Sequence, residues 1–203
     1  MAKIKIKKNS GSTDMTAMCD VAFLLLTFFV MTSTAKLPEV LPVDTPSSTE
    51  QTKLPDSDLV TLTIGDKKVF FDLKGKDVRI KALELMGEKY GVEFTDKEKN
   101  DFGLMTDFGV SIANLKQIIQ MKASDRNKAP QPGIPRDSTD NQLKDWVMNA
   151  RQANVEINQK EPKVAIKGDS KEEYQVIKEI LDIMQDQNVN SFSLVTGLRG
   201  KDF

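Results

Sequence analysis

The sequence contains no histidine and only one cysteine, Cys19. The lack of histidine excludes His-based catalytic triads, most zinc sites and imidazole proton shuttles. A single cysteine cannot close a disulfide within the chain. The phosphate-binding patterns GxxxxGK[ST] and GxGxxG are also missing, so the sequence gives no support for a nucleotide site. We therefore expect no cofactor and no bound metal.

An excess of either charge sign is missing as well. The chain has 29 Lys and Arg against 30 Asp and Glu, which gives a formal net charge of -1 over 203 residues. Proteins that bind nucleic acid normally carry a basic surplus, so we expect no nucleic acid partner. No cluster of reactive side chains is visible, so we do not expect an enzyme. Proton chemistry is left to carboxylates, lysines and tyrosines.

A long apolar run follows a basic start. Four lysines lie within residues 1–8, and residues 15–35 carry a single charge, Asp20. At about 1.5 Å per residue this run reaches roughly 31 Å, which is enough to cross the hydrocarbon core of a bilayer. The positive-inside rule then predicts a cytoplasmic segment at 1–14, a transmembrane helix at 15–35, and an external remainder.

A cleaved secretory signal is the alternative interpretation of the same segment. It too has a basic start, an apolar core (Val21 to Met31) and small residues (Ser33 to Ala35) at a suitable cleavage position. The chain would then be an exported periplasmic binding module. Two features oppose this interpretation: the apolar core begins late, and an acidic residue at its start serves no purpose in export.

Asp20 is the residue of most interest in the apolar run. An ionised aspartate near the centre of a membrane helix costs about 2.5–3.5 kcal/mol, so it is rare unless it has a function. At 100° per residue, three threonines form a polar stripe within about 40° of it: Thr16, Thr27 and Thr34. Because an apolar environment favours the protonated carboxyl, Asp20 could carry a proton. It could also be a boundary residue, one turn inside the headgroups.

These residues also carry a family resemblance. The lysine-rich start, Thr16, Asp20-Val21 and the following LLLTFFVM resemble the ExbD/TolR family, whose usual pattern is T-P-x-x-D-[VL] before a Leu/Phe-rich run. Ala17 stands where proline is usual, and this departure bears on how the helix starts. The resemblance implies that Asp20 is the proton-responsive carboxylate.

The resemblance also implies partners and a location. It predicts an ExbB/TolQ-like polytopic membrane protein, a TonB-like recipient and a second copy of the chain in a homodimer. The place would be the bacterial inner membrane, with the N-terminus cytoplasmic and the C-terminal domain periplasmic. The implied function is ExbD-like: proton motive force is used to energise outer-membrane transport. A TolR-like role in envelope maintenance is the alternative.

A proline-rich segment follows the apolar run. Residues 36–57 hold four of the eight prolines, with Ser and Thr between them and no periodicity. This composition predicts a periplasmic linker. It is either a loose connector without a partner or a tether that rearranges during energy transfer.

Residues 58–203 are expected to form the folded domain. Leu59 to Ile64 and Val69 to Phe71 predict a β-hairpin with a turn at Gly65-Asp66. Further along, Lys163 to Lys167 and Ser191 to Thr196 flank a helix whose start is marked by a Ser170/Glu173 capping box. The fold class is therefore α+β: one transmembrane helix, then a small α/β sandwich-type domain of hairpin, helix and βαβ unit.

The middle of this domain is longer than the resemblance implies. Residues of about 73–137 are predicted to be partly an insertion. Within the middle of the domain, the apolar spacing from Phe108 to Ile119 predicts one helix, and the spacing from Leu143 to Ala153 predicts another that Asp140 caps. Thr95 and Glu98 indicate a helix cap rather than a calcium loop. Trp146 is expected in the core.

Overall fold

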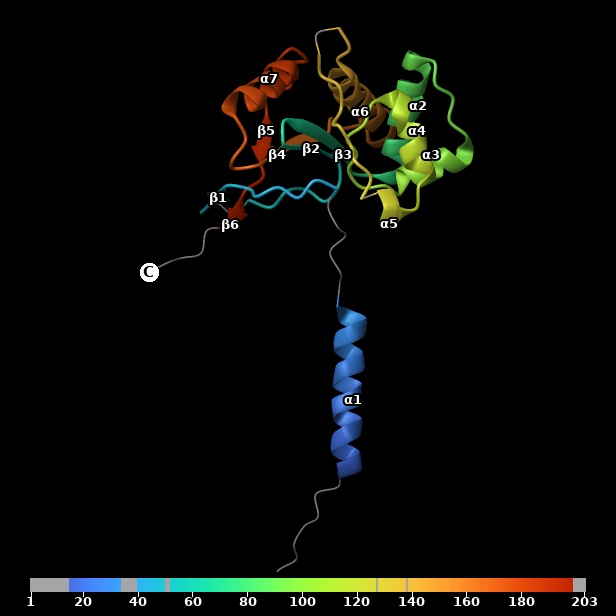
Figure 1. Cartoon of the computed structure of the whole chain (residues 1–203), viewed down its shortest axis with the longest axis vertical. Helices are drawn as coiled ribbons and strands as arrows, with labels where there is room; N and C mark the ends of the chain where they lie inside the picture. Colours follow the sequence, from blue (N-terminus) through green and yellow to red (C-terminus); the bar gives the residue numbers. More distant parts are fainter. Residues whose placement is uncertain (1–14, 34–39, 50–51, 127, 138, 199–203) are drawn as a thin grey trace, which may run out of the picture. The chain divides into compact units, whose positions relative to one another are not determined.

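The computed structural model describes residues 15–33, 40–49, 52–126, 128–137 and 139–198. Contacts divide the chain into two units, Met1–Leu37 and Pro38–Phe203. In the first unit the structure describes helix α1 (Met15–Thr32), an 18-residue apolar helix (Figure 1). At the end of this helix the Ser33 amide donates a hydrogen bond to the Phe29 carbonyl at 2.9 Å. The predicted N-terminal apolar helix is thus confirmed, and residues 34 and 35 lie outside the described part.

The second unit is a mixed α/β domain built around a four-stranded sheet (Figure 1). Its elements in chain order are β1 (Ser47–Ser48), β2 (Leu59–Gly65), β3 (Lys68–Leu73), α2 (Lys76–Tyr90), α3 (Asp96–Gly103), α4 (Ile112–Gln120), α5 (Ala123–Arg126), α6 (Gln142–Asn158), β4 (Lys163–Gly168), α7 (Tyr174–Gln185), β5 (Phe192–Leu194) and β6 (Gly197–Leu198).

Both predicted strand motifs are present in the sheet, whose order is β3-β2-β4-β5. β2 and β3 form the antiparallel hairpin, and β4, α7 and β5 form a βαβ unit with parallel strands. The hairpin turn lies at Asp66 and Lys67, with φ of 51° and 59°, one residue later than predicted. Two residues at positive φ are the geometry that suits the twist of a tight hairpin.

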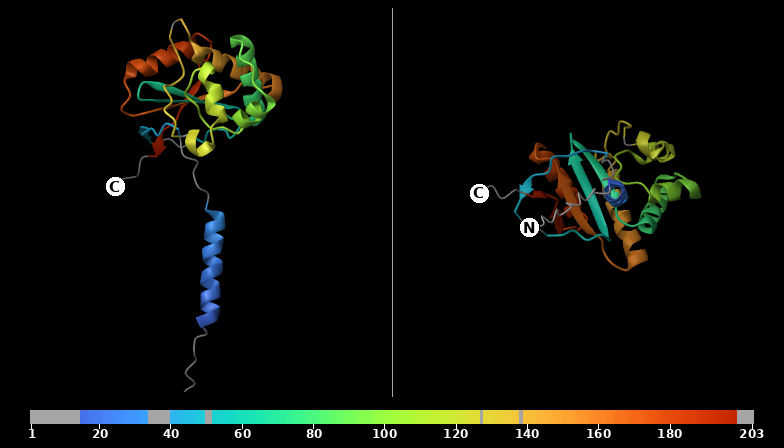
Figure 2. Two further views of the ribbon diagram at one scale, coloured as in Figure 1. Left: turned by 45° about the vertical axis from the view of Figure 1, so that its right-hand side comes forward. Right: turned by 90° about the horizontal axis from the view of Figure 1, so that it is seen from below.

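Helices cover one face of the sheet. The register places Leu62 of β2 between Phe71 of β3 and Ile166 of β4 on this face, and all three side chains are buried. Trp146 of α6 packs on Phe71, with ring centroids 5.7 Å apart, and α7 adds Ile180 to the same apolar cluster. Figure 2 shows these helices ranged along the sheet. Trp146 is in the core, as predicted.

The middle of the domain holds more helix than predicted. α2, which has no marked apolar periodicity in the sequence, packs against α6, and its Arg79 anchors it by donating from Nε to the Leu73 carbonyl at 2.7 Å. α4 and α6 confirm the two predicted helices. Phe108, however, precedes α4 and bridges to Phe71 through backbone hydrogen bonds.

The helix caps agree only in part with the sequence. Thr95 and Glu98 form the predicted capping box of α3. α6 is capped by Asn141, whose side chain accepts from the Lys144 amide at 3.0 Å, and not by Asp140. The Ser170 capping box is wrong, because α7 begins at Tyr174 and its N-cap, Glu173, makes no side-chain cap.

Part of the proline-rich segment is attached to the domain. Residues 40–49, which we call the strap, run along the side of the sheet away from α7 (Figures 1 and 2). The Ser170 amide donates to the Asp44 carbonyl at 2.8 Å, and the Gly197 amide donates to the Pro46 carbonyl at 2.9 Å. β1 in the strap pairs in parallel with β6. The strap therefore differs from a connector without contacts.

Gly65 allows the strap to approach the sheet. A Cβ atom at this position would lie 2.7 Å from Val43 Cγ1 and 3.2 Å from Leu41 Cδ2, closer than carbon atoms pack. Glycine is therefore needed here for the close approach of side chains and not for a positive φ.

We expect Gly65→Ala to loosen the strap and to destabilise the domain by about 1–3 kcal/mol, because the added methyl group overpacks its contact. The measurement is hydrogen exchange at the Ser170 and Gly197 amides, which should exchange faster than in the unmodified protein. Gly168→Ala is the matched control, since its Cβ would meet nothing closer than Ile177 Cδ1 at 3.9 Å. Equal exchange in the two variants would contradict this role of Gly65.

Candidate functional site

Asp20 is the sixth residue of α1. The midpoint of the helix lies between Phe23 and Leu24, so Asp20 is about 5 Å along the axis from the midpoint and roughly 7.5 Å from the first residue. The helix has a mean hydropathy of 1.9 over its 18 residues and meets the length and composition requirements for crossing a membrane. Asp20 thus lies within the apolar length of the helix and not at its end.

Two of the three threonines of the predicted stripe lie within the described helix. Thr16 and Thr27 lie in α1, one turn before and two turns after Asp20, and helical spacing puts both on the same side of the helix as Asp20. Thr27 Oγ1 donates to the Leu24 carbonyl at 2.9 Å, so its hydroxyl is satisfied within the helix. Thr34 lies outside the described residues. Two of the three stripe residues can therefore be placed beside the acid.

The side chains of α1 are not buried by the described parts of the chain. None of its residues is buried, and large apolar side chains such as Phe23, Leu26 and Phe29 are 60–63% exposed. A row of exposed apolar side chains is covered in the native state by lipid or by protein. A carboxylate on the same helix is tolerated where it faces protein or water. α1 therefore needs lipid or protein around it.

Three ionisable groups of the second unit with shifted pKa values have structural partners. Burial lowers the pKa of the Arg79 guanidinium, and its ion pair with Asp72 opposes that effect. The hydrogen bond from the Thr95 amide lowers the pKa of the Glu98 carboxyl. Burial, helped by a hydrogen bond to Asp145 at 2.7 Å, raises the pKa of the Tyr90 hydroxyl. These groups fix helix ends and packing, and no reactive pair results.

No group of three or more acidic or cysteine side chains within the described residues could hold a metal ion. One recess of about 610 Å³ lies beside α2 and is lined mainly by charged side chains. Sequence analysis missed it because α2 itself was not predicted. The available signal was Glu84 and Glu88, spaced four residues apart with Glu93 soon after, which puts two carboxylates on one side of a helix.

Comparison with known proteins adds one finding. A family model described as "Biopolymer transport protein ExbD/TolR" matches residues 7–198. The matched range contains α1 and also the segment of about 73–137 that was predicted to be partly an insertion. No curated protein and no solved structure gave a match.

Proposed function

The chain belongs to the ExbD/TolR family of biopolymer transport proteins, and from this premise we propose that it is the ExbD-like subunit of an inner-membrane complex that energises outer-membrane transport. Members of this family are energy-transducing transport components and not enzymes, and they work with ExbB/TolQ-type partners. The finer assignment, to an ExbB-ExbD-TonB-type complex with two copies of this chain, is our proposal.

The observation that carries the proposal is the place of Asp20 in α1. A carboxylate about 5 Å from the midpoint of an apolar helix has no purpose in anchoring, because charge there only opposes insertion. In the proposed mechanism, Asp20 takes up a proton from one side of the membrane and releases it to the other. Thr16, Thr27 and Thr34 would form the polar side of the helix that faces the polytopic partner.

The free energy released by a moving proton is similar in size to the cost of an ionised Asp20 in the membrane. One proton that crosses a potential of 100 mV releases about 2.3 kcal/mol, and an ionised aspartate at the helix centre costs about 2.5–3.5 kcal/mol. Protonation of Asp20 can therefore change which neighbouring surface α1 prefers. The free energy needed for this change is of a size that the membrane potential can supply. A helix that alternates between two preferred surfaces can move the second unit with it.

Orientation follows from the basic start of the chain. Four lysines within residues 1–8 favour a cytoplasmic N-terminus, and the second unit would then be periplasmic. The intact mass of the protein extracted from membranes tests this assignment against a cleaved signal. A mass that includes residues 1–35 supports the transducer, and a mass without them would make the chain an exported periplasmic module.

Deletion of the chain in its host separates the ExbD-like from the TolR-like role. We expect proton-driven uptake through an outer-membrane receptor to fall to background, while the outer membrane keeps its resistance to detergent and its periplasmic contents. Re-expression of the intact chain should restore uptake. Detergent sensitivity and leakage with normal uptake would instead assign the chain to envelope maintenance.

A further inference from the structure

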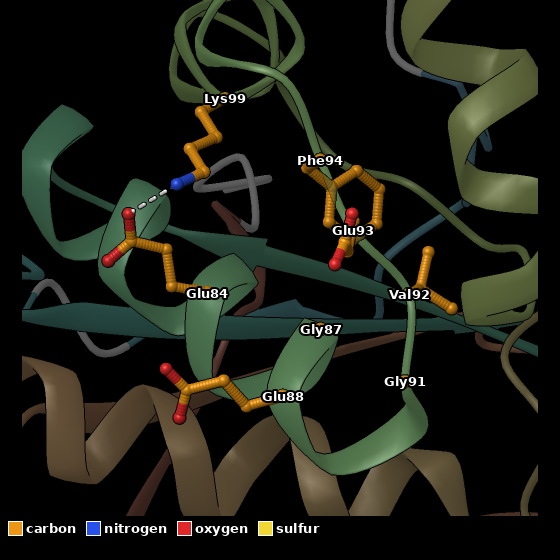
Figure 3. A pocket seen from close by; sticks show the side chains of 8 residues that line it. All are labelled: Glu84, Gly87, Glu88, Gly91, Val92, Glu93, Phe94 and Lys99. Atoms are coloured by element: carbon orange, nitrogen blue, oxygen red, sulfur yellow. Dashed lines mark hydrogen bonds and ion pairs between the residues drawn. The ribbon is translucent and has the colours of Figure 1, made fainter.

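The recess beside α2 is one of several in the second unit, and its lining is rich in carboxylates. It lies between α2 and the loop that follows it, and its volume of about 610 Å³ falls in the range of binding pockets. Figure 3 shows Glu84 and Glu88 on α2, with Glu93 and Phe94 on the loop across from them. Lys99 of α3 completes the lining.

The charge of the recess is not balanced. Lys99 is the lining cation, and it is already engaged by Glu84, with Nζ 2.8 Å from Oε1 (Figure 3). This bond, together with the charges of Glu84, Asp96 and Glu88, raises the pKa of the Lys99 ammonium. Glu88 and Glu93 are exposed, and their carboxylates have no hydrogen-bond or ion-pair partner among the described residues. Two negative charges therefore remain.

Two further elements favour a cation in the same place. α2 ends at the recess with Gly91 in the left-handed conformation (φ 68°), so the negative end of the helix dipole points there. Phe94 is half-buried on the opposite side, and an aromatic ring attracts a cation placed over its face. Lys116 is not a lining residue, and its Nζ is engaged by the Glu93 backbone carbonyl at 3.2 Å and by Glu98 at 3.7 Å.

The form of the recess restricts the kind of cation. The described carboxylates are not gathered closely enough to hold a metal ion. A lysine or arginine side chain suits the arrangement better, because its long apolar stem can lie along Phe94 while its charged end reaches Glu88 and Glu93. A recess open to solvent also admits such a side chain without any rearrangement of α2.

We propose that this recess docks a lysine or arginine side chain presented by a segment of a partner protein. Glu88 and Glu93 supply the charge, Phe94 supplies the contact for the stem, and Lys99 holds Glu84 in place at the rim. The proposal concerns a surface of the second unit, and it holds whether or not Asp20 carries protons.

The test measures binding of a fluorescent peptide of four Lys-Ser repeats to the full-length chain in phosphatidylcholine nanodiscs at low salt. We expect the double variant Glu88→Gln/Glu93→Gln to raise the Kd of the peptide by about tenfold. Each solvent-screened ion pair contributes a factor of up to roughly five to the affinity. Phe94→Ala should raise it by about threefold. A Glu-Ser peptide and empty nanodiscs should show no binding.

Asp182→Asn is the matched control, because it removes an exposed carboxylate from α7, on an element that does not line the recess. We expect its Kd to equal that of the unmodified chain. An unchanged Kd in the double glutamine variant would overturn the proposal, and so would equal weakening by Asp182→Asn. Circular dichroism of each variant checks that the fold is kept, which we expect for the three glutamate and aspartate substitutions because these carboxylates are exposed.

Discussion

Replacing Asp20 by asparagine is expected to reduce proton-driven outer-membrane uptake to the level of a strain that lacks the chain. Asparagine keeps the shape and the polarity of the side chain but cannot accept a proton. Because α1 keeps its length and apolar character, the variant should remain in the membrane at the normal level. The measurement is uptake in the native host, with membrane content determined by immunoblot.

Two substitutions on the same helix serve as controls. Asp20→Glu keeps a titratable carboxyl about one bond further out, so we expect it to retain part of the activity. Cys19→Ser changes the adjacent residue without altering any charge and should leave uptake intact. Normal uptake in Asp20→Asn would make Asp20 a boundary residue and would end the proton-carrier mechanism proposed for it.

Removal of the Trp146 side chain should have the largest effect on folding. Trp146 is fully buried and its ring packs on Phe71, Phe102 and Phe108, with centroids 4.9–5.9 Å away. Large-to-small substitutions of buried aromatic residues cost about 3–5 kcal/mol because they leave a cavity. The free energy of unfolding of an ordinary domain is about 5–15 kcal/mol. Trp146→Ala should therefore remove a large part of it.

Urea unfolding of the full-length chain, followed by circular dichroism, measures this loss. Fluorescence is unsuitable because Trp146 is the single tryptophan. Trp146→Phe should cost clearly less, since it leaves a smaller cavity and the Trp146 Nε1 atom has no hydrogen-bond partner to lose among the described residues. Tyr174→Ala, at a residue 75% exposed, should shift the free energy of unfolding by no more than about 0.5 kcal/mol. Equal unfolding midpoints for Trp146→Ala and Tyr174→Ala would show that the aromatic cluster is not central to stability.

The parts of the fold that could be predicted are those in which local pattern and burial agree. Alternating or continuous apolar residues identified β2, β3 and β4, and the 3.6-residue spacing identified α6 and α7. α1 was evident because 18 largely apolar residues with a single charge near the start of the sequence are typical of a membrane helix or a signal sequence. Asp20 stood out for the same reason, as the charge in that run.

The parts that could not be predicted depend on contacts between distant residues. α2 carries mixed charge on most of its surface, and its position is fixed by Arg79 and by packing on α6 rather than by its own pattern. The strap has the composition of a linker, yet it is held by partners more than 100 positions away, such as Ser170 and Gly197. The recess could not be foreseen because it needs α2 and its loop to be in place.

The pairing at the centre of the sheet has a consequence for the order of folding. β2 lies beside β4, and Leu59 is paired with Lys163, 104 positions later. Contacts at such separation form slowly because a long loop must close first. The central pair cannot form until β4 (Lys163–Gly168) has been synthesised, so the sheet is completed only after all the residues between β2 and β4 have been made. A destabilised β2–β4 pair would therefore be expected to slow the folding of the domain as well as to weaken it.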